Sequence, residues 1–76
     1  MSQSTHFEPR GIRAPDHLVQ WARAEIERVG DYAFARRLGI SRTPPLRVAA
    51  GLSATRGVIA VLQDDYEKNG PHTRAA

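Results

Sequence analysis

Hydrophobic residues recur along this chain at the spacing of amphipathic helices, in four successive stretches between residues 16 and 68. The first stretch covers residues 16–29. Its apolar side chains fall on one face at about 100° per residue: Leu18, Val19, Ala22, Ile26 and Val29. Pro15 and Asp16 suit the beginning of this helix, and Gly30 suits its end. No stretch shows the alternation typical of a strand, so the pattern predicts an all-α protein.

A second helix is predicted over residues 31–38, with Asp31 as its N-cap. Gly39 follows, because glycine can take the positive φ that ends a helix and redirects the chain. Ala35 is small enough for another helix to cross closely, and Ile40 can fill the angle between the two helices. This pattern predicts a helix-turn-helix, a unit whose second helix is typically placed in the DNA major groove.

The second helix of this motif is constrained by Pro44 and Pro45, since a residue before proline avoids helical geometry. The least strained solution makes Thr43 the N-cap and places both prolines in the first turn, where amide hydrogens have no helical partner. The helix is then predicted over residues 44–50 and ends at Gly51. Leu46 and Val48 are expected to face the core.

A fourth helix is predicted to begin at an N-cap Thr55, to continue to Lys68 and to end in Asn69-Gly70-Pro71. Its apolar stripe is wider than the roughly 100° that one surface helix needs. The organisation predicted from the sequence is a flexible N-terminal arm (1–15), a single domain (16–68) and a flexible C-terminal tail (69–76). Arg10 and Arg13 lie in this arm. Arms of this kind can enter the minor groove beside a recognition helix, but a loose terminal segment is the favoured interpretation.

Positive charge is concentrated in the predicted motif. Between Asp31 and Arg56 there are five arginines and one acid, a net charge of +4, whereas the whole chain carries +3. Ten of the eleven cations are arginine, whose planar fork suits phosphate and guanine. The local charge favours a nucleic-acid partner. The alternative is a solvated basic face.

The composition excludes several other classes of function. The chain has 76 residues, enough for one domain, and no apolar run approaches the roughly 20 residues of a membrane span. Without cysteine or a signal-peptide pattern, a cytoplasmic location is expected. The three histidines are far apart, so we expect no metal, no cofactor, no small-molecule ligand and no enzyme activity. The acidic residues Asp64, Asp65 and Glu67 are interpreted as solvated surface.

Two runs of the sequence resemble a known family. ARRLGIS (35–41) is very similar to the first motif helix and turn of the lambda-repressor-like DNA-binding domains. AAGLSATRGVIAVL (49–62) resembles the loop and helix that close these domains, including the lac-repressor-type headpieces. The resemblance covers residues 16–68 and implies a four-helix lambda-repressor-like helix-turn-helix fold, in a small regulator of the kind that phages and plasmids encode. Pro44-Pro45 departs from the family, which has polar helix formers there.

The resemblance places the first base-contacting side chains at Arg42 and Thr43, although for Arg42 a contact with phosphate is an equal alternative. Arg47 lies one turn further along, and we expect it to bind guanine O6 and N7; the alternative is that it contacts only phosphate. Contacts to the DNA backbone are predicted for Tyr32, Arg36, Arg37, Ser41, Thr55 and Arg56. Arg36 and Arg37 point about 100° apart, so they cannot face DNA equally. Thr55 can instead serve only as a cap.

A dimer interface is predicted from Trp21, Ile59, Val61 and Tyr66. Trp21 lies about 110° from the centre of the apolar face of its helix, and a partly exposed tryptophan can mark an interface. The alternative is that Trp21 packs under Phe7 or Ile12. For the wide stripe on the last helix, the alternative is a buried core helix.

The first hypothesis from the sequence is a homodimeric, sequence-specific regulator of transcription that binds a palindromic double-stranded DNA operator, acting as a repressor. The second is a protein-binding adaptor or antitoxin-like module that keeps the helix-turn-helix fold, favoured by Pro44-Pro45 and an exposed Trp21. A third is an accessory protein that bends DNA.

Overall fold

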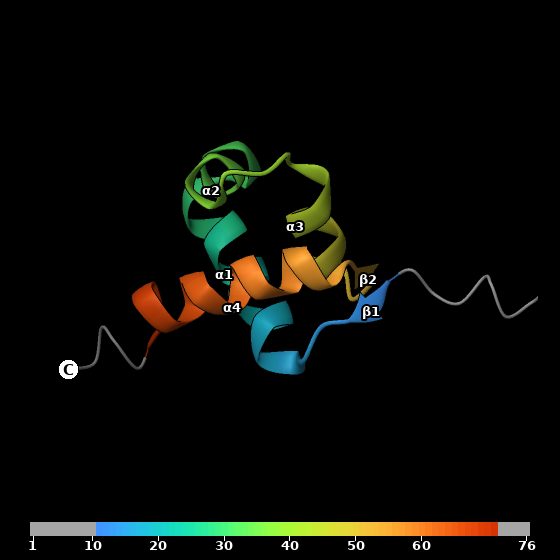
Figure 1. Cartoon of the computed structure of the whole chain (residues 1–76). Helices are drawn as coiled ribbons and strands as arrows, with labels where there is room; N and C mark the ends of the chain where they lie inside the picture. Colours follow the sequence, from blue (N-terminus) through green and yellow to red (C-terminus); the bar gives the residue numbers. More distant parts are fainter. Residues whose placement is uncertain (1–10, 72–76) are drawn as a thin grey trace, which may run out of the picture.

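Four helices dominate the computed structural model, which describes residues 11–71 (Figure 1). They are α1 (Asp16–Val29), α2 (Asp31–Leu38), α3 (Thr43–Ala49) and α4 (Arg56–Asn69). Two short strands, β1 (Ile12–Arg13) and β2 (Ser53–Ala54), complete the fold. The four predicted helices are confirmed with bounds within one residue, and the domain is mostly helical. In the part of the chain from residue 11 to 71, no helix is both long and apolar enough to cross a membrane.

The ends of the helices follow local chemistry. Gly30 and Gly39 adopt φ values of 93° and 78°, which side chains with a Cβ rarely adopt. The Thr55 hydroxyl accepts the Val58 N–H at 3.2 Å, which confirms Thr55 as the N-cap of α4. These residues set the helix boundaries that the sequence predicts.

Two other cap predictions were wrong. The N-cap of α2 is Gly30, and Asp31 is the first helical residue. Thr43 is likewise the first residue of α3, and Arg42 precedes it as N-cap. Proline lacks the N–H that a Thr43 side chain would accept, and the next N–H, that of Leu46, donates to the Arg42 carbonyl at 3.3 Å. The helix therefore starts one residue earlier than predicted.

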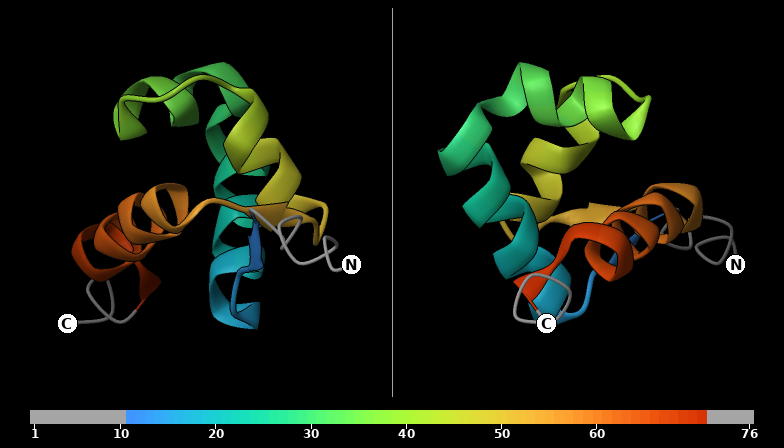
Figure 2. Two further views of the ribbon diagram at one scale, coloured as in Figure 1. Left: turned by 45° about the vertical axis from the view of Figure 1, so that its right-hand side comes forward. Right: turned by 90° about the vertical axis from the view of Figure 1, so that its left-hand side faces the viewer.

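The hydrophobic core surrounds α1, against which the other three helices pack (Figure 2). Its fully buried apolar side chains come from all four helices: Leu18, Ala22, Phe34, Val48 and Leu62. The prediction that Leu46 faces this core was wrong, since Leu46 is 40% exposed. Val48 is buried as predicted, and Pro45, three residues before it on the same face of α3, is buried with it.

The strands form a minimal antiparallel ribbon that the sequence did not predict. Ile12 pairs with Ala54, and Arg13 pairs with Ser53. The prediction of a flexible arm was therefore wrong for this part of it, and the segment is anchored further by the buried Ala14. Residues 1–10 of the arm and 72–76 of the tail lie outside the described residues. The ribbon places the chain before α1 beside the loop that follows α3.

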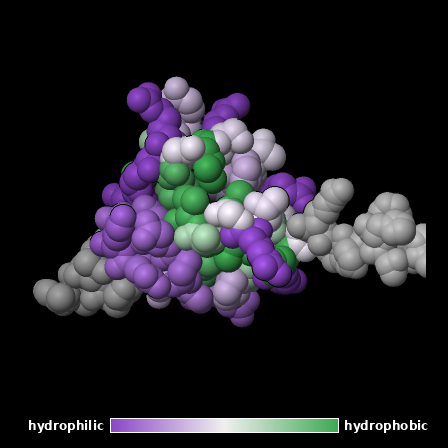
Figure 3. All heavy atoms as spheres, in the orientation of Figure 1, coloured by the Kyte–Doolittle hydropathy of each residue, from purple (hydrophilic) through white to green (hydrophobic). Residues whose placement is uncertain are grey.

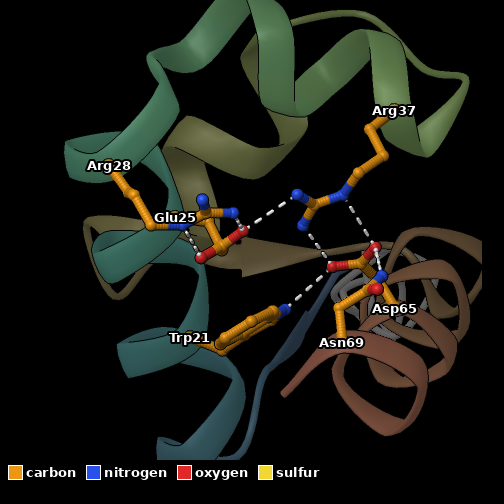
Figure 4. A network of polar contacts seen from close by, with 6 residues as sticks. All are labelled: Trp21, Glu25, Arg28, Arg37, Asp65 and Asn69. Atoms are coloured by element: carbon orange, nitrogen blue, oxygen red, sulfur yellow. Dashed lines mark hydrogen bonds and ion pairs between the residues drawn. The ribbon is translucent and has the colours of Figure 1, made fainter. Parts of the chain in front are cut away.

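A polar network joins three helices at the guanidinium of Arg37 (Figure 4). Arg37 Nη1 lies 2.9 Å from Glu25 Oε1 on α1. Its Nε and Nη2 donate to the two carboxylate oxygens of Asp65 on α4, at 3.0 and 2.6 Å. Arg28 binds the Glu25 carboxylate from the same helix through two further hydrogen bonds of 2.9 and 2.8 Å. One arginine of α2 thus fixes the positions of α1 and α4.

Trp21 completes this network. Its indole Nε1 donates to Asp65 Oδ2 at 2.9 Å, and its ring meets Tyr66 edge-on at a centroid distance of 5.8 Å. Trp21 is only 5% exposed and Asp65 only 7%. The predictions of a partly exposed tryptophan and a solvated Asp65 were therefore wrong, because α4 packs over Trp21 and brings Asp65 to the indole N–H.

The network lowers the pKa of Glu25 from its ordinary value of 4.5 to about 2. The largest cause is the hydrogen bond from Arg28; burial acts in the opposite direction, and Arg37 lowers the pKa further. A carboxylate with a lowered pKa stabilises the folded state above its unfolded pKa, and this contribution is lost as the pH falls towards the folded value. The relevant window is therefore between about pH 5 and pH 2.

We predict that the free energy of unfolding falls across this window by an amount on the order of 3 kcal/mol attributable to Glu25. Glu25→Gln should be less stable at neutral pH and should lose this part of the pH dependence. Urea denaturation at a series of pH values measures both effects. Glu27→Gln removes an exposed carboxylate from the same helix and serves as the matched control. If the free energy of unfolding of Glu25→Gln fell with pH as steeply as that of the wild type, the assignment of this pH dependence to Glu25 would be contradicted.

Candidate nucleic-acid interface

The outward face of α3 and its C-cap is formed by four residues at helical spacing. Thr43, Leu46, Arg47 and Ala50 are exposed. The intervening Pro45 and Val48 are buried, and α3 packs chiefly against α1. This face is consequently open to a partner along its whole length, which is about two helical turns.

The residues predicted to contact bases lie along this face and the turn before it. Arg42 is exposed in the turn, with Nη1 3.9 Å from Asp31 Oδ2, a long and solvent-accessible ion pair. Thr43 follows it at the first position of α3. Arg47 is exposed one turn further on, and its Nε donates to the Ser53 carbonyl at 3.2 Å. This hydrogen bond holds the Arg47 side chain towards the end of α3 that meets β2.

The residues predicted to contact the DNA backbone are divided between two places. Tyr32, 60% exposed, and Arg36 lie on α2, with the Arg36 guanidinium carbon 5.7 Å from the Tyr32 ring centroid. Ser41 is exposed in the turn. Thr55 and Arg56 are exposed at the other end of the motif, where Thr55 caps α4. The capping role considered for Thr55 is thus observed.

Arg37 was wrongly predicted as a phosphate contact. All three of its guanidinium nitrogens are engaged by Glu25 and Asp65. Arg36 and Arg37 differ because neighbouring helical residues point in different directions, and only Arg37 is directed towards acids on other helices. Nothing local in the sequence distinguishes the two, since Asp65 is 28 residues away.

Several arginines of this region have no ion pair with any residue from 11 to 71. They are Arg13, Arg23, Arg36, Arg47 and Arg56. Arg23, on α1, donates to the Ala49 carbonyl at 3.0 and 2.8 Å and so completes the C-terminal end of α3. Arg13 is held by the ribbon. Sequence reasoning placed Arg13 in the N-terminal arm, but it predicted neither the pairing of this arm with the loop after α3 nor the contact of Arg23 with α3, because both depend on tertiary structure.

The residues predicted for a dimer interface differ in exposure. Trp21 is buried, and Tyr66 is partly buried against Trp21 and the His17 ring. Ile59 and Val61 are partly exposed on α4. Figure 3 shows apolar surface gathered between α2 and α3 on one side and α4 on the other, bordered by hydrophilic side chains. Apolar area for an interface thus remains on α4, but the buried Trp21 does not contribute to it.

Between residues 11 and 71, no group of three or more histidine, aspartate or glutamate side chains is arranged to hold a metal ion. No protein-family model matches the chain, and no match was found among curated proteins or among solved structures. The assignment of function therefore depends on the chemistry of the surface.

The two adjacent arginines should behave differently on substitution. Arg37→Ala leaves the buried Glu25 and Asp65 without their shared partner, so we expect a loss of about 2–4 kcal/mol in the free energy of unfolding. Arg36→Ala, which removes an exposed side chain, should change it by less than about 0.5 kcal/mol. Denaturant titration of both variants checks this. Equal losses of unfolding free energy in the two variants would contradict the conclusion that only Arg37 pairs with buried acids.

Proposed function

We propose that this protein is a sequence-specific double-stranded DNA-binding regulator of transcription that inserts α3 into the major groove. In this proposal α2, the turn and α3 form a helix-turn-helix of the lambda-repressor-like type. Arg42, Thr43 and Arg47 contact bases, and Tyr32, Arg36, Ser41, Thr55 and Arg56 contact the sugar-phosphate backbone.

One observation carries the proposal: the exposed face of α3 is bordered by arginines that have no ion pair within residues 11–71. Arg36 and Arg47 lie before and within α3, and Arg56 lies after it. Unpaired arginines around an exposed helix supply the phosphate attraction and the hydrogen-bond donors that duplex DNA requires. The acids of α4, by contrast, lie in its second half, away from Arg56 at its first residue.

The proposed regulator acts as a homodimer and a repressor. Two copies of α3 about 34 Å apart would contact successive major grooves of a palindromic operator, and occupancy of a promoter would block transcription. Ile59 and Val61 supply apolar area on α4 for the contact between copies. No cofactor is required.

Selection of binding sites from random duplex DNA by the purified chain tests this proposal. Enrichment of an inverted repeat supports a dimeric regulator, with half-sites about one helical turn apart. A single asymmetric motif supports DNA recognition and contradicts the dimer. Absence of enrichment, with binding that weakens little as salt rises, contradicts the proposal and favours a protein-binding adaptor with the same fold.

Arg47→Ala should weaken binding to the selected duplex by about 1–3 kcal/mol and relax the base preference at one position. Binding to a duplex of unrelated sequence should weaken less. Lys68→Ala removes a positive charge that is paired with Asp64 on the second half of α4, and it serves as the control. Equal losses on both duplexes would show that Arg47 contacts phosphate and does not read a base.

A further inference from the structure

The ribbon brings a segment from before α1 to the C-terminal end of α3. Arg13 pairs through its backbone with Ser53, and its Nη2 lies 3.8 Å from the position that a Cβ on Gly51 would occupy. Gly51 directly follows α3 and its C-cap, and it adopts a φ of 82°. The Arg13 side chain therefore extends over the backbone at the end of α3, where glycine leaves space for it.

Arg47 reaches the same segment from the opposite side of the loop. Its Nε donates to the carbonyl of Ser53, the residue that pairs with Arg13. Beside it, a shallow concavity of about 220 Å³ is lined by Gly11, Arg47, Ser53, Ala54 and Thr55. Arg56 follows β2 closely and borders a neighbouring groove together with Arg13. Arg13 and Arg56 thus border one groove beside the ribbon, and Arg47 borders the concavity on Ser53.

The positive charge of the arginines beside the ribbon has no counterion among residues 11 to 71. Arg13, Arg47 and Arg56 are therefore available to an anion from outside the described residues. Arginine binds phosphate oxygens through two parallel hydrogen bonds. The surface suits a phosphodiester backbone that passes beside the ribbon.

We propose that the β1–β2 ribbon is a DNA-backbone-binding element in which Arg13 contacts a phosphate next to the groove occupied by α3. This inference rests on the proposed function and extends it to a residue outside the helix-turn-helix. The ribbon fixes the backbone of Arg13 before DNA binds, so less conformational entropy is lost in forming the contact than with an unpaired arm.

Gly11 provides a way to disturb the ribbon without removing charge. A Cβ at this position would lie 2.5 Å from Ser53 Oγ, 2.7 Å from Ser53 Cβ and 3.3 Å from the Ala54 nitrogen. Gly11→Ala should therefore displace β1 from β2 while it leaves Arg13 in the chain. Arg13→Lys keeps both the charge and the ribbon, and Arg13→Ala removes the charge alone.

The experiment measures binding of the full-length chain to a labelled duplex of mixed sequence, and to the selected duplex, over a range of salt concentrations. Arg13→Ala should weaken binding to both duplexes by about 3- to 10-fold at low salt and reduce the slope of log K against log[salt] by about 0.9, the value for one phosphate contact. Arg13→Lys should keep the wild-type slope. Gly11→Ala should weaken binding to a similar extent, and adding Arg13→Ala to it should have little further effect.

Lys68→Ala is the control for a simple change in net charge and should bind as the wild type does. Circular dichroism and the thermal midpoint establish that each variant is folded. If Arg13→Ala binds like Lys68→Ala while Arg47→Ala binds more weakly, the role of Arg13 is overturned and the proposed function stands. If the wild-type chain binds neither duplex, both proposals are overturned.

Discussion

The arrangement of the helices depends on one guanidinium group, that of Arg37. It binds Glu25 of α1 and both carboxylate oxygens of Asp65 of α4, so the position of α2 is defined relative to two other helices at once. A domain of 76 residues has a small hydrophobic core, and apolar contacts alone specify helix orientation loosely. A buried ion network adds little net stability, but breaking it leaves buried charges unpaired. The network here holds α1, α2 and α4 together through Arg37.

The same network divides the arginines of the motif into two groups. Arg37 neutralises acids inside the fold, whereas Arg36 and Arg47 have no ion pair within residues 11–71. The positive charge that is left without an acidic partner in this part of the chain therefore lies on Arg36 of α2 and Arg47 of α3. α1 also supports the exposed helix α3 directly, because Arg23 donates two hydrogen bonds to the carbonyl of Ala49, the last residue of α3. The helix that organises the core thus also positions the exposed helix.

The helix bounds could be predicted from the sequence because glycine, proline and threonine act within one turn of their own position. Gly39 and Thr55 end and begin helices irrespective of the rest of the fold. The network and the ribbon could not be predicted, since Trp21 meets Asp65 across 44 residues and a two-residue strand has no period to detect. For the candidate site, the sequence predicted the exposed helix α3, whereas the pairing of Arg37 and the position of Arg13 depend on which residues pack beside them.

The prolines at the start of α3 show how a small local constraint determines the exposed face. Because Pro44 and Pro45 offer no N–H, they suit the first turn of α3, which begins at Thr43. Pro45 and Val48, three residues apart, share its buried face, whereas Leu46 is exposed. Leu46 and Arg47 then lie side by side on a surface only two turns long. Such a short helix offers few side chains to bases, so a DNA-binding protein of this design needs backbone contacts from its surroundings. The ribbon and the beginning of α4 are the elements that the fold places there.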